Sequence, residues 1–333
     1  MTAGDRETLR TDATGLFCPA GGFHIDPWKP SPCAVITHAH ADHARRGSAR
    51  YVAHLHSVPI LQHRLGTDAP IEGRGYDEPF EIGGVTVSLH PAGHVRGSAQ
   101  VRVQSDTDVW VVSGDYKRET DPTCETFRPV ACDVFITEST FGLPIYRWPD
   151  PEHVAREIND WWRTERDRGR TCVLYAYSLG KAQRLLARLD PSIGPIALHP
   201  AIDDITALYR EQGVDLPPTT RFLQTTAKEL RGGAMVLIPP SAEGAKALKA
   251  LGPVSDGSAS GWMTTRASRR WRSYDRGFVM SDHADWPGLL CTIRETGATR
   301  IGVTHGSVAP FVRYLRETGL DAFPLDTRYE GDG

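Results

Sequence analysis

The stretch Thr37-His38-Ala39-His40-Ala41-Asp42-His43-Ala44 decides how this sequence is interpreted. It follows the apolar run Ala34-Val35-Ile36, which predicts a buried strand that leads into a loop and then a helix. Three imidazoles and a carboxylate within this run are difficult to explain as packing, because such side chains are seldom buried without a partner. The first two histidines alternate onto one side of an extended segment, whereas the aspartate and the third histidine fall at the turn. We therefore expect two metal positions, with a solvated histidine-rich loop as the alternative.

The length and composition of the chain fit an ordinary soluble protein. A chain of 333 residues suits two domains, or one domain with a large insertion. Hydrophobic residues make up 40% of it and charged residues 24%. No apolar run reaches the length of a membrane span, and residues 1–14 lack the apolar core of a signal peptide. We expect a cytoplasmic protein that does not bind membranes.

The charge balance and the cysteines argue against further classes of protein. With 38 basic and 41 acidic residues the net charge is −3, which disfavours a protein that coats nucleic acid but leaves room for a local basic groove. The cysteines form no CxxC pair, so the sequence indicates neither a thiolate zinc site nor a disulfide framework. They are Cys18, Cys33, Cys124, Cys132, Cys172 and Cys291.

Polar side chains recur where predicted strands end, and the middle of the chain has a different character. Four such residues follow apolar stretches: His94, Asp115, Glu138 and His305. This placement predicts a site along one rim of a sheet sandwich. After residue 142 the pattern alternates strand, helix, strand, helix, which predicts a separate α/β unit with parallel strands. We expect a first domain in two parts, residues 1–147 and 277–333, with an inserted domain at 148–276.

The candidate ligands are too many for one ion and suit two ions that share a carboxylate. They are His38, His40, Asp42, His43, His94, Asp115 and His305. We expect one ion to be held by His38, His40 and His94, the other by Asp42, His43 and His305, and Asp115 to bridge. Zinc is the preferred metal, and manganese is the alternative. Two divalent ions activate a water and stabilise the phosphoryl or acyl oxygen that gains charge. The alternatives are turn roles for His94 and Asp115 and a helix-flanking role for His305.

These motifs resemble the metallo-β-lactamase superfamily and, within it, the β-CASP nucleases. The HxHxDH run, His94 and Asp115 match the superfamily motifs in order. Glu138 in Thr137-Glu138-Ser139-Thr140-Phe141-Gly142 resembles the acidic motif that opens the β-CASP insert, and His283 resembles the histidine motif that closes it. The resemblance implies an α/β fold, a metallo-β-lactamase αββα sandwich with an inserted α/β β-CASP domain.

A narrower resemblance is to the bacterial DNA-ligase-associated exonucleases. It rests on residues 17–28, Phe-Cys-Pro-Ala-Gly-Gly-Phe-His-Ile-Asp-Pro-Trp, and on Met280-Ser281-Asp282-His283-Ala284-Asp285-Trp286. Many β-CASP members have Ser-Ala-His where this chain has Ser-Asp-His. The resemblance implies a two-metal-dependent single-strand DNA exonuclease that acts in repair on single-stranded DNA or DNA ends, in functional association with a DNA ligase and a helicase. An RNA-processing β-CASP ribonuclease, a small-molecule metallo-hydrolase and a binding protein without metal are the alternatives.

The same resemblance implies catalytic roles for Asp42, Glu138 and His283. Glu138 and His283 would form a pair near the leaving group, with the histidine as general acid. A carboxylate partner raises the pKa of an imidazole and fixes its orientation, which suits that role. The alternatives are a surface acid at a strand end for Glu138 and a helix-start residue for His283.

Two stretches are candidates for contact with nucleic acid. Ser178-Leu179-Gly180-Lys181 lies between a strand and a helix start, where backbone N–H groups and the lysine suit a phosphate. An ordinary helix start is the alternative. Farther along, arginines interleave with aromatic residues, which suits sequence-tolerant binding of a single strand or, equally, a solvated basic edge. The candidate contacts there are Arg266, Arg269, Arg270, Trp271 and Arg272.

Overall fold

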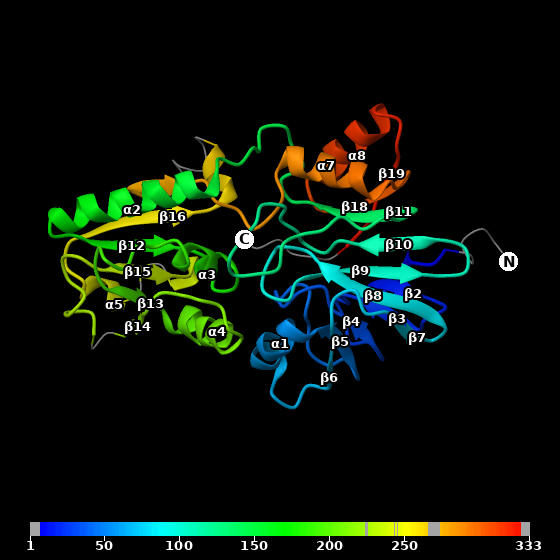
Figure 1. Cartoon of the computed structure of the whole chain (residues 1–333), viewed down its shortest axis with the longest axis horizontal. Helices are drawn as coiled ribbons and strands as arrows, with labels where there is room; N and C mark the ends of the chain where they lie inside the picture. Colours follow the sequence, from blue (N-terminus) through cyan, green and yellow to red (C-terminus); the bar gives the residue numbers. More distant parts are fainter. Residues whose placement is uncertain (1–6, 224–225, 243, 245, 266–273, 328–333) are drawn as a thin grey trace. The chain divides into compact units, whose positions relative to one another are not determined.

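The computed structural model describes residues 7–223, 226–242, 244, 246–265 and 274–327. The chain divides into two compact units, Met1–Tyr146 with His283–Gly333 and Arg147–Asp282. Figure 1 gives the order of the helices and strands, and each unit is described by itself. No helix of the described residues is both long enough and apolar enough to cross a membrane.

The first unit contains a six-stranded sheet in the order β1 to β6. Its strands β1 to β3 are antiparallel, and β3 to β6 are parallel. Their bounds are Arg10–Thr11, Leu16–Cys18, Phe23–Ile25, Ala34–Val35, Tyr51–His54 and Ile71–Arg74. Helix α1 (Val58–Leu65) lies against β6 and buries Ile60, Leu61 and Leu65. The short β4 is the strand that leads into the histidine-rich run.

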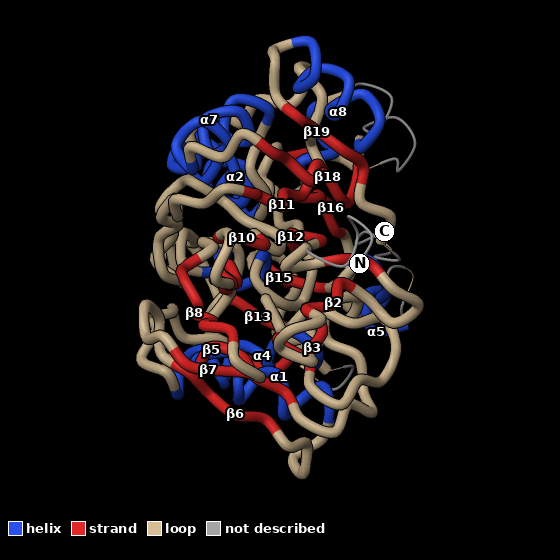
Figure 2. The backbone as a smooth tube through the Cα atoms, turned by 90° about the vertical axis from the view of Figure 1, so that its right-hand side faces the viewer, coloured by secondary structure: helices blue, strands red, loops and turns tan. Residues whose placement is uncertain are grey.

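The second sheet of this unit has seven strands in the order β19-β18-β11-β10-β9-β8-β7. The neighbours from β7 to β10 are antiparallel, whereas β10, β11, β18 and β19 run parallel. In chain order from β7 the bounds are Phe80–Ile82, Val85–Pro91, Ala99–Gln104, Val109–Val112, Val134–Ser139, Arg300–Gly306 and Asp321–Pro324. Helices α7 (Trp286–Thr296) and α8 (Val308–Glu317) lie together beside β18 and β19 (Figure 2).

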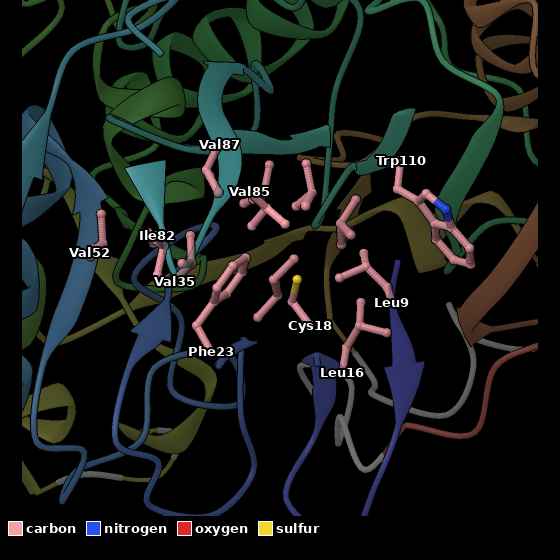
Figure 3. Packing of buried hydrophobic residues seen from close by; sticks show 14 of the residues in the cluster. Leu9, Leu16, Cys18, Phe23, Val35, Val52, Ile82, Val85, Val87 and Trp110 are labelled. Atoms are coloured by element: carbon pink, nitrogen blue, oxygen red, sulfur yellow. The ribbon is translucent and has the colours of Figure 1, made fainter. Parts of the chain in front are cut away.

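Two apolar clusters hold this unit together. One draws on both sheets and includes Phe23, Val35, Val85 and Trp110 (Figure 3). The other joins the seven-stranded sheet to α7 and α8 and includes Phe135. Alternate residues of the central strands enter the two clusters, so these strands are buried on both faces, as is usual for parallel strands. The candidate site lies at the ends of these strands, beyond the two clusters.

The second unit is built on a six-stranded sheet in which every neighbouring pair is parallel, as the alternation of strands and helices predicts. The order is β14-β13-β15-β12-β16-β17. From β12 to β17 the bounds are Thr171–Tyr175, Ile196–Leu198, Thr220–Arg221, Met235–Ile238, Val254–Ala259 and Arg276–Phe278. The helices are α2 (Pro151–Asp167), α3 (Lys181–Leu186), α4 (Pro200–Glu211) and α5 (Lys246–Lys249).

The structure corrects one expectation about the histidine-rich run. No helix follows Ala44, because residues 40–48 form turns instead. The N–H groups of His43 and Ala44 both reach the carbonyl oxygen of His40, at 3.2 and 2.9 Å. The chain then leaves this single turn through Gly47, whose φ of 101° no helix accommodates. The segment therefore forms a turn that carries the polar side chains, and the predicted helix does not form there.

The close approach at Gly306 leads to a stability prediction. Gly306 has φ 83°, and a Cβ there would lie 2.5 Å from the carbonyl oxygen of Ser139. Gly319 has φ 92°, but a Cβ there would meet nothing within 4 Å. We expect Gly319→Ala to lower the free energy of unfolding by about 1–2 kcal/mol. Gly306→Ala should lower it by about 1–3 kcal/mol more, because the backbone must also move. Urea unfolding of the two variants measures the difference; equal losses would contradict it.

Candidate metal centre

The histidine-rich run is fixed in place by backbone bonds on both sides. Ile36 N donates to Val52 O on β5 at 2.8 Å, and Ala99 N on β9 donates to Thr37 O at 2.7 Å. These bonds tie the start of the run to a strand of each sheet. His38 and His40 therefore leave the sheets at the rim where β4 ends, and both are buried.

One group of candidate ligands comes from three separate segments. His38, His40, His94 and Asp115 place one ligand atom each so that all lie within 4.8 Å of one another. His40 Nδ1 and His94 Nε2 are 3.1 Å apart. The four residues are 0 to 5% exposed, so their polar atoms are largely shielded from bulk solvent. This is the set expected at the first ion, together with the expected bridge.

A second group contains Asp42, His43 and His305, whose ligand atoms also lie within 4.8 Å of one another. Asp115 faces both groups through a single oxygen. Asp115 Oδ2 is 3.5 Å from His38 Nε2 and 3.6 Å from His43 Nε2. This carboxylate oxygen lies close to one imidazole of each group. A carboxylate that bridges two metal ions would occupy such a position.

The donor atoms fit divalent metal ions. His38 Nε2 is buried and has no hydrogen-bond partner among the described residues. Such a buried nitrogen is unfavourable unless a ligand satisfies it. Its Nδ1 is 3.0 Å from Thr37 Oγ1, which leaves Nε2 as the atom that faces Asp115. Imidazoles and carboxylates in two sets of three to four are the donors that zinc and related ions take.

Burial and neighbouring charges act differently on the two central histidines. Burial, with the imidazoles of His43 and His94, lowers the pKa of His38 well below its ordinary value. Burial also opposes protonation of His43, but the carboxylates of Asp115 and Asp26 outweigh it and raise the pKa of His43 to about 10. Burial raises the pKa of Asp115. Without a metal, then, the neighbouring carboxylates favour the protonated form of His43.

A third group joins the bridge to the expected proton donor. Ligand atoms of Asp115, Glu138 and His283 lie within 4.8 Å of one another. His283 Nδ1 is 2.8 Å from Glu138 Oε2, and Tyr116 N donates to Glu138 Oε1 at 2.8 Å. Burial alone would raise the pKa of Glu138, yet its bond and charge interaction with His283 lower it. Glu138 is 1% exposed, so it is not a surface acid.

The candidate nucleic-acid contacts fall in the second unit. Lys181 begins α3 and is 4% exposed. Its Nζ lies 3.4 Å from Asp282 Oδ2 and 4.5 Å from the centre of the Tyr177 ring. The lysine charge therefore already has a carboxylate partner, and Ser178 lies three residues earlier in the loop. The remaining predicted contacts lie outside the described residues: Arg266, Arg269, Arg270, Trp271 and Arg272.

Comparison with known proteins finds relatives in two functional groups. A probable DNA ligase of Opitutus terrae is 29% identical over 315 residues, which are 93% of this chain and 30% of that protein. The endoribonuclease ysh1 of Schizosaccharomyces pombe is 35% identical over 122 residues, 36% of this chain and 16% of that protein. Cleavage and polyadenylation specificity factor subunit 3 of Dictyostelium discoideum is 32% identical over 123 residues, again 36% and 16%. The latter two are β-CASP proteins.

The chain is similar to β-CASP proteins of the metallo-β-lactamase superfamily, through the relatives named above. It spans less than a third of the length of each of these three relatives. No family model matches the sequence. A solved structure of a protein of unknown function from Enterococcus faecalis V583 shares the fold, with a TM-score of 0.62 at 12% identity over 90% of this chain and 80% of that one.

One supporting residue of this site, Asp26, was missed by the sequence motifs. Asp26, 1% exposed, accepts from Thr37 N at 2.8 Å and Thr37 Oγ1 at 2.5 Å, and lies 2.7 Å from His43 Nδ1. It thereby orients His43 directly and His38 through Thr37, as outer partners of metal ligands do. Asp26 has φ 44°, a conformation that few non-glycine residues adopt. Its place after the apolar strand at Phe23–Ile25 was the available signal.

The raised pKa of His43 predicts that metal binding releases protons from this site. With a pKa of about 10 the metal-free imidazole is protonated at pH 7.5, and an ion at Nε2 must displace that proton. We expect release of about one proton per chain from His43 at pH 7.5, falling away as the pH rises through that pKa. Zinc titration calorimetry in two buffers of different ionisation enthalpy measures it. A binding heat independent of the buffer at pH 7.5 would contradict the prediction.

Proposed function

We propose that this chain is a two-metal phosphodiesterase that degrades DNA from an end. The observation that carries the proposal is the third group, in which Glu138 and His283 adjoin Asp115 within 4.8 Å. An acid pair at this distance from a water-activating centre places a proton donor next to the bond that breaks. Hydrolysis of a phosphodiester needs such a donor for the leaving oxygen. A small-molecule hydrolase of the superfamily, the weaker candidate, has less use for the pair.

We propose that the two sheets of the first unit form the αββα sandwich of the superfamily. Helix α1 covers the six-stranded sheet, and α7 and α8 cover the seven-stranded one, which supports this assignment. The inserted β-CASP domain, expected at residues 148–276, then corresponds to the second unit, Arg147–Asp282, whose sheet includes β17. The two parts of the catalytic domain, expected at residues 1–147 and 277–333, correspond to the first unit. The parallel sheet of the second unit suits an inserted α/β domain.

The roles of the ligands follow from the groups in which they lie. His38, His40 and His94 would hold one ion, and Asp42, His43 and His305 the other, with Asp115 between them. Bound zinc ions, or manganese in their place, lower the pKa of a water and stabilise charge on the phosphoryl oxygens.

The protein's own groups would position the substrate and move the proton. Asp42 is the acid of the second set that retains partial exposure, so its carboxylate is placed to orient the attacking water. His283 would donate from Nε2 to the leaving oxygen, since its Nδ1 is directed to Glu138. Glu138 fixes the orientation of the imidazole and favours its protonated form. The proton therefore comes from a group that is not a ligand in either proposed set.

The choice of DNA rests on the similarity that spans 93% of the chain. The matched relative is a probable DNA ligase of which this region is 30%, so in that protein the two parts share one polypeptide. We propose that this chain processes single-stranded DNA or DNA ends in repair, in functional association with a ligase and a helicase. Contacts to the strand would come from Ser178, Lys181 and the arginine-rich stretch at 266–272.

An RNA-processing ribonuclease is the second candidate. The endoribonuclease relative is 35% identical, a higher value than the ligase gives, although over only 36% of the chain. Similarity over that segment supports a common type of cleavage reaction in the two proteins. It does not decide between DNA and RNA as the substrate. An RNA substrate would be reached through the same metal ligands and the same acid pair.

Labelled oligonucleotides distinguish the candidates. Single-stranded DNA and RNA, labelled at one end and prepared with and without a 5′ phosphate, are incubated with the protein and zinc or manganese. We expect stepwise shortening of the DNA and little change in the RNA. Internal cuts in the RNA would replace the proposal with the ribonuclease, and an inactive protein that retains two bound ions would overturn both.

Removal of the proton donor should slow cleavage without loss of metal. We expect His283→Ala and Glu138→Gln each to lower kcat by about 10²- to 10⁴-fold, because the leaving oxygen then departs without general acid catalysis. Metal content, measured by mass spectrometry of the purified variants, should stay at the wild-type value. His63→Ala removes an exposed histidine of α1 and serves as the control. Joint loss of metal and activity in His283→Ala would show that His283 is a ligand instead.

A further inference from the structure

His305 reaches the second ligand group only because the end of β18 is not a regular strand. Residues alternate between the two faces of a strand, so His305 would share a face with Val303 and Ile301. Both of these pack into the cluster with α7 and α8. A regular strand would therefore direct the imidazole of His305 toward the helices and away from Asp42 and His43.

The observed backbone turns His305 to the opposite side. His305 has φ 57°, in the left-handed region, and Gly306 follows with φ 83°. As a result Thr304 and His305, which are adjacent in sequence, both line the small cavity beside Asp26, His43 and Asp115. A non-glycine residue in this conformation is strained, and it persists only where surrounding contacts hold it.

Ser139, the last residue of β11, makes those contacts. Its side chain is 0% exposed, and its hydroxyl donates to His305 O at 2.5 Å, with Thr304 O at 3.2 Å. Its carbonyl oxygen accepts from Ser307 N at 2.8 Å. The register of β11 and β18 shifts at this point: Glu138 pairs with Thr304 and Ser139 with Gly306, so that His305 lies in a β-bulge. Ser139 thus holds the carbonyl groups on which the turn depends.

We propose that Ser139 is a positioning residue, whose hydroxyl holds the left-handed turn at His305 and so presents the imidazole to the second of the two metal ions. The inference rests on the proposed two-ion site and adds a residue that is not itself a ligand. Its partners are both backbone carbonyls, so it acts on the direction of the imidazole and not on its charge. Outer contacts of this kind tune metal affinity about 10- to 100-fold.

Competitive zinc titration tests the role of Ser139. The metal-free protein is titrated with zinc against a chromophoric chelator, and two binding constants are fitted. We expect Ser139→Ala to weaken one of the two by about 10- to 100-fold and to leave the other unchanged. Ser31→Ala is the control, because Ser31 is buried and donates to Cys33 O at 2.9 Å but contacts none of the proposed ligands. It should leave both constants unchanged.

The double variant identifies the affected ion. In a His305→Ala background, which lacks the second-set imidazole, Ser139→Ala should change neither remaining constant. Equal weakening of both ions by Ser139→Ala, or a further loss in the double variant, would show a general structural role and overturn the proposal. A wild-type protein that binds a single ion would overturn it as well. None of these outcomes depends on nucleic acid cleavage, so failure of the proposed substrate is distinguished from failure of this inference.

The strain at residue 305 has a separate readout in the metal-free protein. His305→Ala and His305→Gly both remove the imidazole, but only glycine adopts φ 57° without strain. We expect the glycine variant to melt about 2–4 °C above the alanine variant. Equal melting temperatures would show that the left-handed turn stores no strain, and the proposed need for Ser139 to hold it would fall.

Discussion

The buried carboxylate of Asp115 is the constraint on which the site depends. It lies 5% exposed at the end of β10, within 3.5 to 3.9 Å of nitrogens of His38, His43 and His94. A carboxylate is buried in this way only when positive charge accompanies it. Imidazoles from the loops after β4 and β8 supply that positive charge when they are protonated, or they bind a metal ion that would supply it. The central strands of the seven-stranded sheet are buried on both faces, and their ends lie together where these side chains meet.

Several residues near the rim have backbone conformations that occur in neither a regular strand nor a helix. Asp26 and His305 have positive φ, and so has Gly114, with φ 57°, where a Cβ would lie 2.7 Å from Thr37 Cβ. Each departure sits immediately before or at a residue that contacts the ligand groups. The apolar clusters between the sheets and beneath the helices stabilise the unit enough to tolerate this strain, which is common at functional sites.

The sequence predicts residue types and strand ends better than it predicts directions. His38, His94 and Asp115 could be identified because their chemistry is unusual after an apolar stretch, and the structure brings them together. Asp26 and Ser139 act through hydrogen bonds to other residues, so their residue type alone does not reveal their role. The prediction of a helix directly after Ala44 was wrong. The backbone makes a single turn there, and so short a stretch of sequence does not show whether a turn will continue into a helix. The parallel sheet of the second unit was predictable, since its alternation of strands and helices is repeated several times.

The end of β11 connects the two halves of the proposed chemistry. Consecutive residues of a strand face opposite sides, and here Glu138 turns to His283 whereas the Ser139 hydroxyl turns to the backbone of His305. One residue therefore orients the proposed proton donor, and the next orients a ligand of the proposed second ion. A shift of this strand end by one residue would turn each side chain to the other face and break both contacts. The proposed proton donor and the proposed second ion are accordingly held at a fixed spacing by one strand end, as cleavage of one bond with both would require.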